Sequence, residues 1–126
     1  MKKEILVGVF LILMLTAALV NIHYLNKLTG DVVAFIQEAE SAALEEDWID
    51  AEIKAEAAAK LWTESDSYTH LVLRHPEIES ATDALYGLLE KIYSKEPGAV
   101  KGAAQAAEAR LKSLASIEEI RFGSIF

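Results

Sequence analysis

An unbroken apolar run, Ile5–Val20, follows directly after two lysines and constrains this chain more than any other feature. As an α-helix, its sixteen residues rise about 24 Å at about 1.5 Å per residue. Extended to Leu25, the segment reaches about 30 Å, which is the thickness of the hydrocarbon core of a bilayer. No comparable run occurs downstream. The sequence therefore predicts an N-terminal transmembrane anchor at residues 1–25, with residues 5–25 in contact with the lipid bilayer.

The charges on the two sides of this run predict its orientation. Lys2 and Lys3 flank the N-terminal end, whereas the nearest lysine on the other side is Lys27. Short flanks rich in lysine and arginine stay in the cytoplasm. We therefore expect a single-pass protein of the cell membrane, with a cytoplasmic N-terminus and an extracytoplasmic C-terminal domain.

A secretory signal peptide is the alternative interpretation. The two lysines would form its basic region, Ile5–Leu15 its apolar region and Thr16-Ala17-Ala18 a cleavage site of small residues. Against cleavage, Leu19 and Val20 continue the apolar run where a polar region is expected. Cleavage near Ala18 would release a soluble, secreted helical binding protein.

The charge of the remaining chain restricts its partners. From His23 onward the sequence has ten Lys/Arg and nineteen Asp/Glu residues, a net charge of −9. Such a surface repels phosphate backbones, so we expect no nucleic-acid partner. It also repels anionic lipid headgroups, which predicts that the domain stands off the bilayer. The chain has no cysteine, so it cannot form a disulfide framework.

Helical periodicity continues out of the apolar run without a change of phase. The apolar residues keep a three-four spacing through Leu25, Leu28, Val32, Phe35, Ala39 and Ala42. This spacing predicts one continuous helix from about residue 4 to about Glu46. A loop between anchor and domain would have scrambled the register. Gly30 lies inside the predicted helix and lowers its propensity by about 1 kcal/mol.

Capping and turn residues divide the rest of the chain into helices. Asp47 is a good N-cap for a helix that begins at Trp48, and this helix should end before Pro76 because proline disfavours helical geometry at the preceding residue. Pro76 and Pro97 open the next two helices. No segment alternates like a strand, so the predicted fold is all-α: a transmembrane helix continuous with a small four-helix antiparallel bundle of two helical hairpins. The extracytoplasmic domain takes up residues 26–126, with helices at about 26–46, 48–74, 76–93 and 97–116 and an apolar C-terminal tail at 117–126.

The sequence contains two weakly similar units, each made of a turn followed by a helix. An offset of 49 residues aligns Asp47-Trp48 with Glu96-Pro97 and superimposes the apolar positions that follow. Such spacing suggests paired antiparallel hairpins, similar to tetratricopeptide-type units.

Several short motifs carry a resemblance to a known family. They are the lysine pair with its apolar anchor, Trp62, Glu45-Glu46-Asp47-Trp48, His75-Pro76-Glu77-Ile78-Glu79 with Leu85, and Ser124-Ile125-Phe126. With these motifs the chain resembles domain-of-unknown-function family 4363, whose members are short bacterial single-pass proteins. The chain departs from the family pattern at Pro76, where an acid is frequent, and at Pro97-Gly98, where a charged turn is usual. The resemblance implies an anchored helical domain and transfers no activity and no functional residues.

Candidate chemical groups are sparse. His70 and His75 lie five residues apart, with Glu79 near, so the two histidines lack the i, i+4 spacing of a zinc site, and the additional ligands are missing. The acids around Asp47 lack the glycine and the alternating ligands of a calcium loop. The sequence has no glycine-rich phosphate loop and no nucleophile elbow. We therefore expect no metal, no cofactor, no small-molecule substrate and no enzymatic activity.

The C-terminal tail and one face of small residues are the candidate contacts with a protein partner. The tail either folds back over the bundle or docks on another protein. The residues that we expect to bind a partner are Phe122, Ile125 and Phe126, together with Ala51, Ala55 and Ala58 if the tail leaves them uncovered. The predicted function is a membrane-anchored interaction module, an accessory subunit of another membrane or envelope protein.

Overall fold

The computed structural model describes residues 1–65, 69 and 73–125, except for the side chains of Glu118, Phe122 and Ile125. These residues form four helices: α1 (Lys2–Leu44), α2 (Trp48–Glu64), α4 (His75–Tyr93) and α5 (Pro97–Ile125). No strand occurs in this part of the chain. The predicted all-α class is confirmed.

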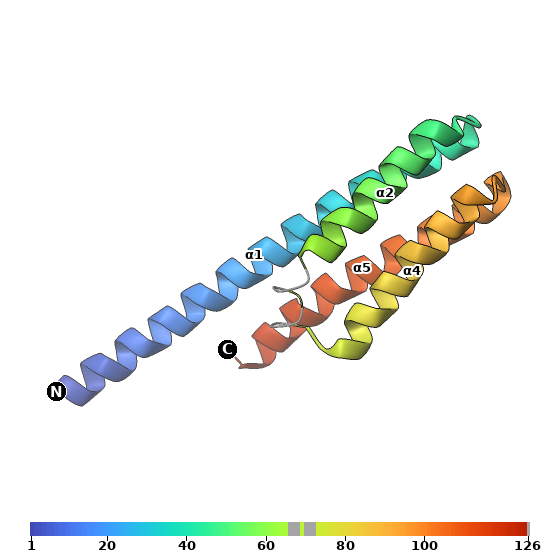
Figure 1. Ribbon diagram of the computed structural model, residues 1–126. Helices are drawn as coiled ribbons and strands as arrows, with labels where there is room; N and C mark the ends of the chain where they lie inside the picture. The colour runs from blue at the N-terminus through green and yellow to red at the C-terminus, as the bar shows by residue number, and fades with distance from the viewer. Residues whose placement is uncertain (66–68, 70–72, 126) are drawn as a thin grey trace.

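The four helices form an antiparallel bundle (Figure 1). α1 and α2 make one hairpin and α4 and α5 make the other. The hairpins lie side by side, so that α1 also packs against α5 and α2 against α4. This arrangement agrees with the predicted bundle of two hairpins. At its N-terminal end α1 extends far beyond the other three helices (Figure 1).

The apolar seams predicted from the three-four spacing lie inside the bundle. In α4 and α5 the apolar residues at three-four spacing are buried: Ile78, Ala81, Leu85, Leu88, Ile92, Val100, Ala104, Ala107, Leu111 and Leu114. The seam of α2 consists mainly of alanines, which allow neighbouring backbones to approach closely. Trp62 supplies its bulk; the side chain is 2% exposed, and its Nε1 donates to Thr82 Oγ1 of α4 at 3.0 Å.

α1 is one unbroken helix of 43 residues, about 64 Å long at about 1.5 Å per residue. It passes through Gly30 without interruption, which confirms the predicted continuity between the apolar segment and the bundle. The first buried residue of α1 is Leu25. We call residues 1–24, which contain no buried side chain, the overhang.

The same turn closes both hairpins. After α1, the N–H of Glu46 donates to the Ala43 carbonyl at 3.0 Å and the N–H of Asp47 to the Ala42 carbonyl at 2.9 Å. The residues 49 positions later make the equivalent bonds, from Lys95 to Ile92 and from Glu96 to Lys91. Glu46 and Lys95 also share a positive φ, 60° and 56°. These features define a Schellman motif, and they repeat at the offset that aligns the two units in the sequence.

The second helix is shorter than predicted. It was expected over residues 48–74, but α2 ends at Glu64; residues 66–68 and 70–72 of the predicted span lie outside the described part of the chain. Thr63 and Ser65 donate their hydroxyl groups to carbonyl oxygens four residues earlier, at 2.9 and 3.0 Å. The apolar spacing that suggested a longer helix marks a buried face and not the residue at which the helix ends.

The C-terminal tail predicted at residues 117–126 is instead the last part of α5, which is helical through Ile125. Two polar contacts hold these turns against the bundle. Asn26 Nδ2 of α1 donates to Glu119 Oε1 at 3.2 Å, and Arg121 Nη2 donates to Glu77 Oε1 of α4 at 2.8 Å. The end of α5 is therefore a wall of the bundle and not a separate extension.

Replacing Glu46 with glycine should stabilise the bundle. A left-handed conformation costs a residue with a Cβ atom about 1–2 kcal/mol, whereas glycine adopts it freely and loses part of this gain through its more flexible unfolded state. We expect Glu46→Gly to raise the free energy of unfolding by about 0.5–1 kcal/mol, measured by denaturation in mild detergent and followed by circular dichroism.

Glu45→Gly is the matched control for this substitution. It removes the same charge one residue earlier, where φ is −86° and glycine offers no relief. It should lower the stability. A gain of equal size in both variants would show that lost charge, and not backbone geometry, is responsible.

Candidate functional site

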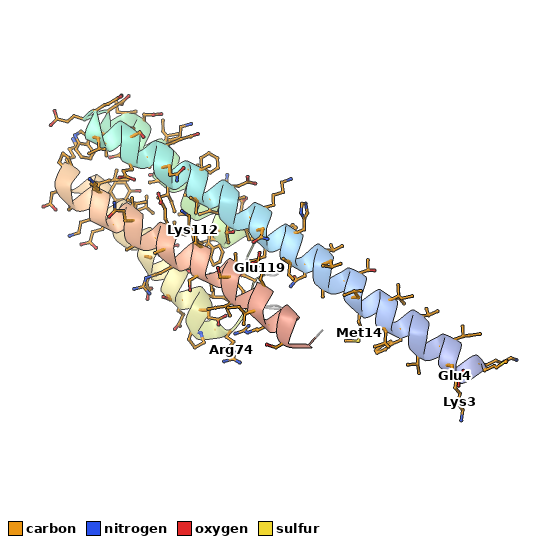
Figure 2. The ribbon with its side chains drawn as sticks, turned by 180° about the vertical axis from the view of Figure 1, so that it is seen from behind. Lys3, Glu4, Met14, Arg74, Lys112 and Glu119 are labelled. Atoms are coloured by element: carbon orange, nitrogen blue, oxygen red, sulfur yellow. The ribbon has the colours of Figure 1, made fainter. Side chains whose placement is uncertain are left out.

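The overhang of α1 presents a long apolar surface. Its large apolar side chains between Ile5 and Val20 are 38–68% exposed, and its most apolar 18-residue window has a mean hydropathy of 2.7. Figure 2 shows Lys3 and Glu4 at its tip and Met14 on its flank. Soluble domains rarely leave so large an apolar surface open to water. By length and composition the helix is suited to cross a membrane.

The backbone of the overhang is satisfied internally, as a lipid environment requires. The segment is helical from Lys2 onward, so its amides bond within the helix. The hydroxyl group of Thr16 donates to the Ile12 carbonyl at 2.9 Å, which leaves no polar side chain of the apolar run without a bond inside the helix. The overhang therefore has both the exposed surface and the hydrogen bonding of a membrane segment.

The foot of the bundle, where the overhang meets the bundle, is built by the ends of α4 and α5 beside α1 (Figures 1 and 2). A groove of about 300 Å³ between α1 and α5 is lined by Asn26, Thr29, Gly30, Val33, Lys112, Ala115, Ser116 and Glu119. On the α4 side, the Arg121–Glu77 ion pair is largely shielded, because its side chains are 31% and 18% exposed. Polar contacts thus add to the buried apolar residues Leu25, Ile78 and Leu114 at the foot.

The predicted contact residues divide into two groups. Ala51, Ala55 and Ala58 are at most 1% exposed and belong to the core of the bundle. This part of the prediction is corrected: neighbouring helices cover the small-residue face, which leaves no surface there for a partner. The side chains of Phe122 and Ile125 and all of Phe126 lie outside the described part of the chain, so the prediction for these three residues stays a prediction.

The seam between α4 and α5 carries a surface that the sequence reasoning missed. A groove of about 560 Å³, open to solvent, is lined by Pro76, Glu77, Ser80, Ala106, Ala109, Arg110, Ser113, Leu114 and Ile117. A neighbouring groove of about 520 Å³ continues along the same seam past Ala103 and Gly87. The signal in the sequence was a second stripe of small residues on α5, beside the buried one. Arg110 crosses the seam and donates to Ser80 Oγ.

Titratable side chains do not converge on a reactive centre in the described part of the chain. His75 Nε2 lies 2.9 Å from Glu79 Oε1, and both side chains are well exposed. His70, its partner in the metal interpretation, lies outside the described residues. Among the residues that are described, no group of three His, Cys, Asp or Glu side chains is placed to hold a metal ion. Asp47 caps α2 as predicted, with its Oδ1 accepting from the Asp50 N–H at 3.2 Å.

One tyrosine links the outer faces of α2 and α4. The hydroxyl group of Tyr93 donates to Glu56 Oε1 at 2.7 Å. This hydrogen bond to a carboxylate raises the pKa of Tyr93 above its ordinary value, with smaller contributions from partial burial and from the nearby charges of Glu56 and Glu52. The bond favours the protonated phenol, so it stabilises the fold below the ordinary pKa of tyrosine and is lost as the pH rises through the higher pKa of the folded state.

Tyr93→Phe should therefore cost about 0.5 kcal/mol of stability at pH 8, since the bond lies at a half-exposed surface. The difference from the wild type should shrink at pH values above about 10, where the wild type itself ionises. Thermal unfolding at pH 8 and pH 11 would measure both effects. Tyr86→Phe, on the same helix and equally exposed, is the matched control and should change the stability at pH 8 little; an equal loss in both variants would contradict a specific bond to Glu56.

Comparison with known proteins identifies a family and no assigned activity. A family model described as "Domain of unknown function (DUF4363)" matches residues 19–125. No curated protein and no solved structure matches the chain. The matched segment contains the whole of α2, α4 and α5 and begins six residues before the first buried residue, Leu25.

Proposed function

We propose that this chain, which belongs to the DUF4363 family of domains of unknown function, is a membrane-anchored interaction module without catalytic activity. Residues 5–25 cross the cell membrane, and the bundle stands outside the cytoplasm. The bundle contacts another membrane or envelope protein as an accessory subunit. The exposed apolar overhang, continuous with a wall of the bundle, is the observation that carries this proposal.

The length of the overhang supports a full membrane crossing. From Lys3 to Tyr24 it rises about 32 Å, which matches the hydrocarbon core of a bilayer. A lipid environment removes the cost of exposing its apolar side chains to water, which is about 25 cal/mol for each Å². The lysine pair at its tip supports a cytoplasmic N-terminus.

A secreted, soluble helical protein is the second candidate. One observation favours it: the first buried residue is Leu25, so cleavage near Ala18 removes nothing from the core of the bundle. The family match also begins at Leu19. The two candidates therefore share the same folded domain and differ only in the fate of the first eighteen residues.

Intact mass after membrane fractionation separates the two candidates. An anchored protein should be recovered from the membrane fraction at the mass of the uncleaved chain, whereas a secreted protein should be soluble and lighter by the mass of about eighteen residues. A single cysteine introduced by Lys95→Cys, in a chain without native cysteine, reports orientation. Its reaction with a membrane-impermeant maleimide in intact cells is expected, and protection until the cells are opened would contradict an external bundle.

The α4–α5 groove supports a protein partner. Its floor carries Ala106 and Ala109, which are exposed, and small residues let the backbone of a partner helix approach closely. Arg110, which also lines the groove and is exposed, offers a positive charge there. The small-residue face of α2 lacks this access, because it is buried.

Co-purification in mild detergent tests the partner. We expect another membrane or envelope protein to accompany the wild type and to be lost from Ala106→Arg, which places a long cation in the groove. Ala34→Arg, at an exposed alanine of a different groove on α1 and α2, should retain it. A wild-type protein that stays strictly monomeric and free of partners in mild detergent would count against an accessory subunit.

A further inference from the structure

α5 returns along α1 far enough to overlap the apolar segment. Asn26 bonds to Glu119 across the two helices, and the residues that line the groove between them follow the same antiparallel register. Each residue further along α5 therefore lies level with one residue earlier on α1. This register places Ile125 level with Val20, about 9 Å closer to the tip of the overhang than Asn26 at about 1.5 Å per residue.

The last turns of α5 have the composition of a lipid contact. Ile120 is 68% exposed. The sequence adds Phe122 and Ile125 within the next five positions, all inside the helix. If Val20 enters the lipid, the backbone of α5 at these positions reaches the boundary between hydrocarbon and headgroups. Apolar residues at this depth gain by leaving water.

Several acidic side chains at the foot of the bundle lie in polar contacts, which reduces their repulsion of lipid headgroups. Among the acidic side chains that the structure describes there, Glu64, Glu77 and Glu79 each lie beside a basic side chain, in the contacts Glu64–Lys60, Glu77–Arg121 and Glu79–His75, and Glu119 accepts from Asn26. The acidic turn at Glu45-Glu46-Asp47 lies at the opposite end of the bundle (Figure 1). The net charge of the domain predicted that it stands off the bilayer, but that charge is unevenly distributed along the bundle. Lys27 and Arg74, both exposed, are left to face lipid phosphates.

We infer that the last turns of α5, residues 120–125, are a second lipid contact that seats the foot of the bundle in the interfacial region of the bilayer. The inference rests on the proposed anchor, because only an inserted overhang brings α5 to this depth. This second contact would fix the orientation of the bundle relative to the bilayer. With α1 as the single contact the bundle could tilt, whereas two helices in contact with lipid hold one side of the bundle to the surface.

Single cysteines in the full-length protein test this contact. The chain has no native cysteine, so one environment-sensitive fluorophore can be placed at Ile120→Cys or Ser124→Cys, both at exposed positions. The labelled protein is reconstituted in phosphatidylcholine vesicles that contain nitroxide-labelled lipids, with the nitroxide either near the headgroups or deep in the acyl chains. Two sites on α5 guard against a local disturbance by either substitution.

Two control sites make the outcomes distinguishable. Leu13→Cys, in the overhang, should be quenched by the deep nitroxide, and Lys95→Cys, at the far turn, by neither. We expect the α5 sites to be quenched several-fold more strongly by the shallow nitroxide than the far turn is. If Leu13→Cys is quenched but both α5 sites behave like Lys95→Cys, the second contact is overturned and the anchor stands. If Leu13→Cys itself escapes quenching, the anchor fails and the inference fails with it.

Discussion

The fold depends on one helix that carries two kinds of surface. The exposed first part of α1 is apolar on all sides, whereas from Leu25 onward only one face is apolar and that face is buried against α2 and α5. An α-helix satisfies its backbone hydrogen bonds internally, so it can pass from an apolar phase into water without exposing unpaired groups. Since no joint interrupts α1, its direction in the overhang also sets the direction of the bundle. A flexible linker at this point would uncouple the two and remove the register between the foot of the bundle and the apolar segment.

Packing against α1 explains the composition of its neighbours. α2 presents alanines with one large residue, Trp62, whose indole N–H is satisfied by Thr82 on α4. α5 closes the ring on the other side of α1 and is held at its end by polar contacts to both hairpins. Both turns place a residue other than glycine in the left-handed conformation at the equivalent position, Glu46 in one and Lys95 in the other. This conformation lowers the stability at both positions. The repeated geometry indicates that the turn and the helix pair behave as one structural unit used twice.

Most of the architecture was predictable from local patterns, and the errors have local causes. Three-four spacing indicates which residues face a neighbour, so the buried face of α1 was predicted well, with Phe35 partly buried. The same spacing does not mark the residue at which a helix ends, which is why the second helix was predicted to run past Glu64. It also cannot say which helix covers a given face. The alanines at 51, 55 and 58 were therefore offered as a partner surface, although α2 turns them into the core.

By itself the sequence determined the class of the fold, the apolar overhang and the continuity of α1, because these follow from periodicity and composition along a single segment. Only the tertiary structure decided how far α5 returns along α1, since Asn26 and Glu119 are 93 residues apart and no local pattern links them. It also decided that the outer seam of α4 and α5 is grooved, because the groove depends on how the small residues of α4 face those of α5. The groove and the position of α5 beside α1 thus arise from contacts between distant segments, which form when the whole chain packs.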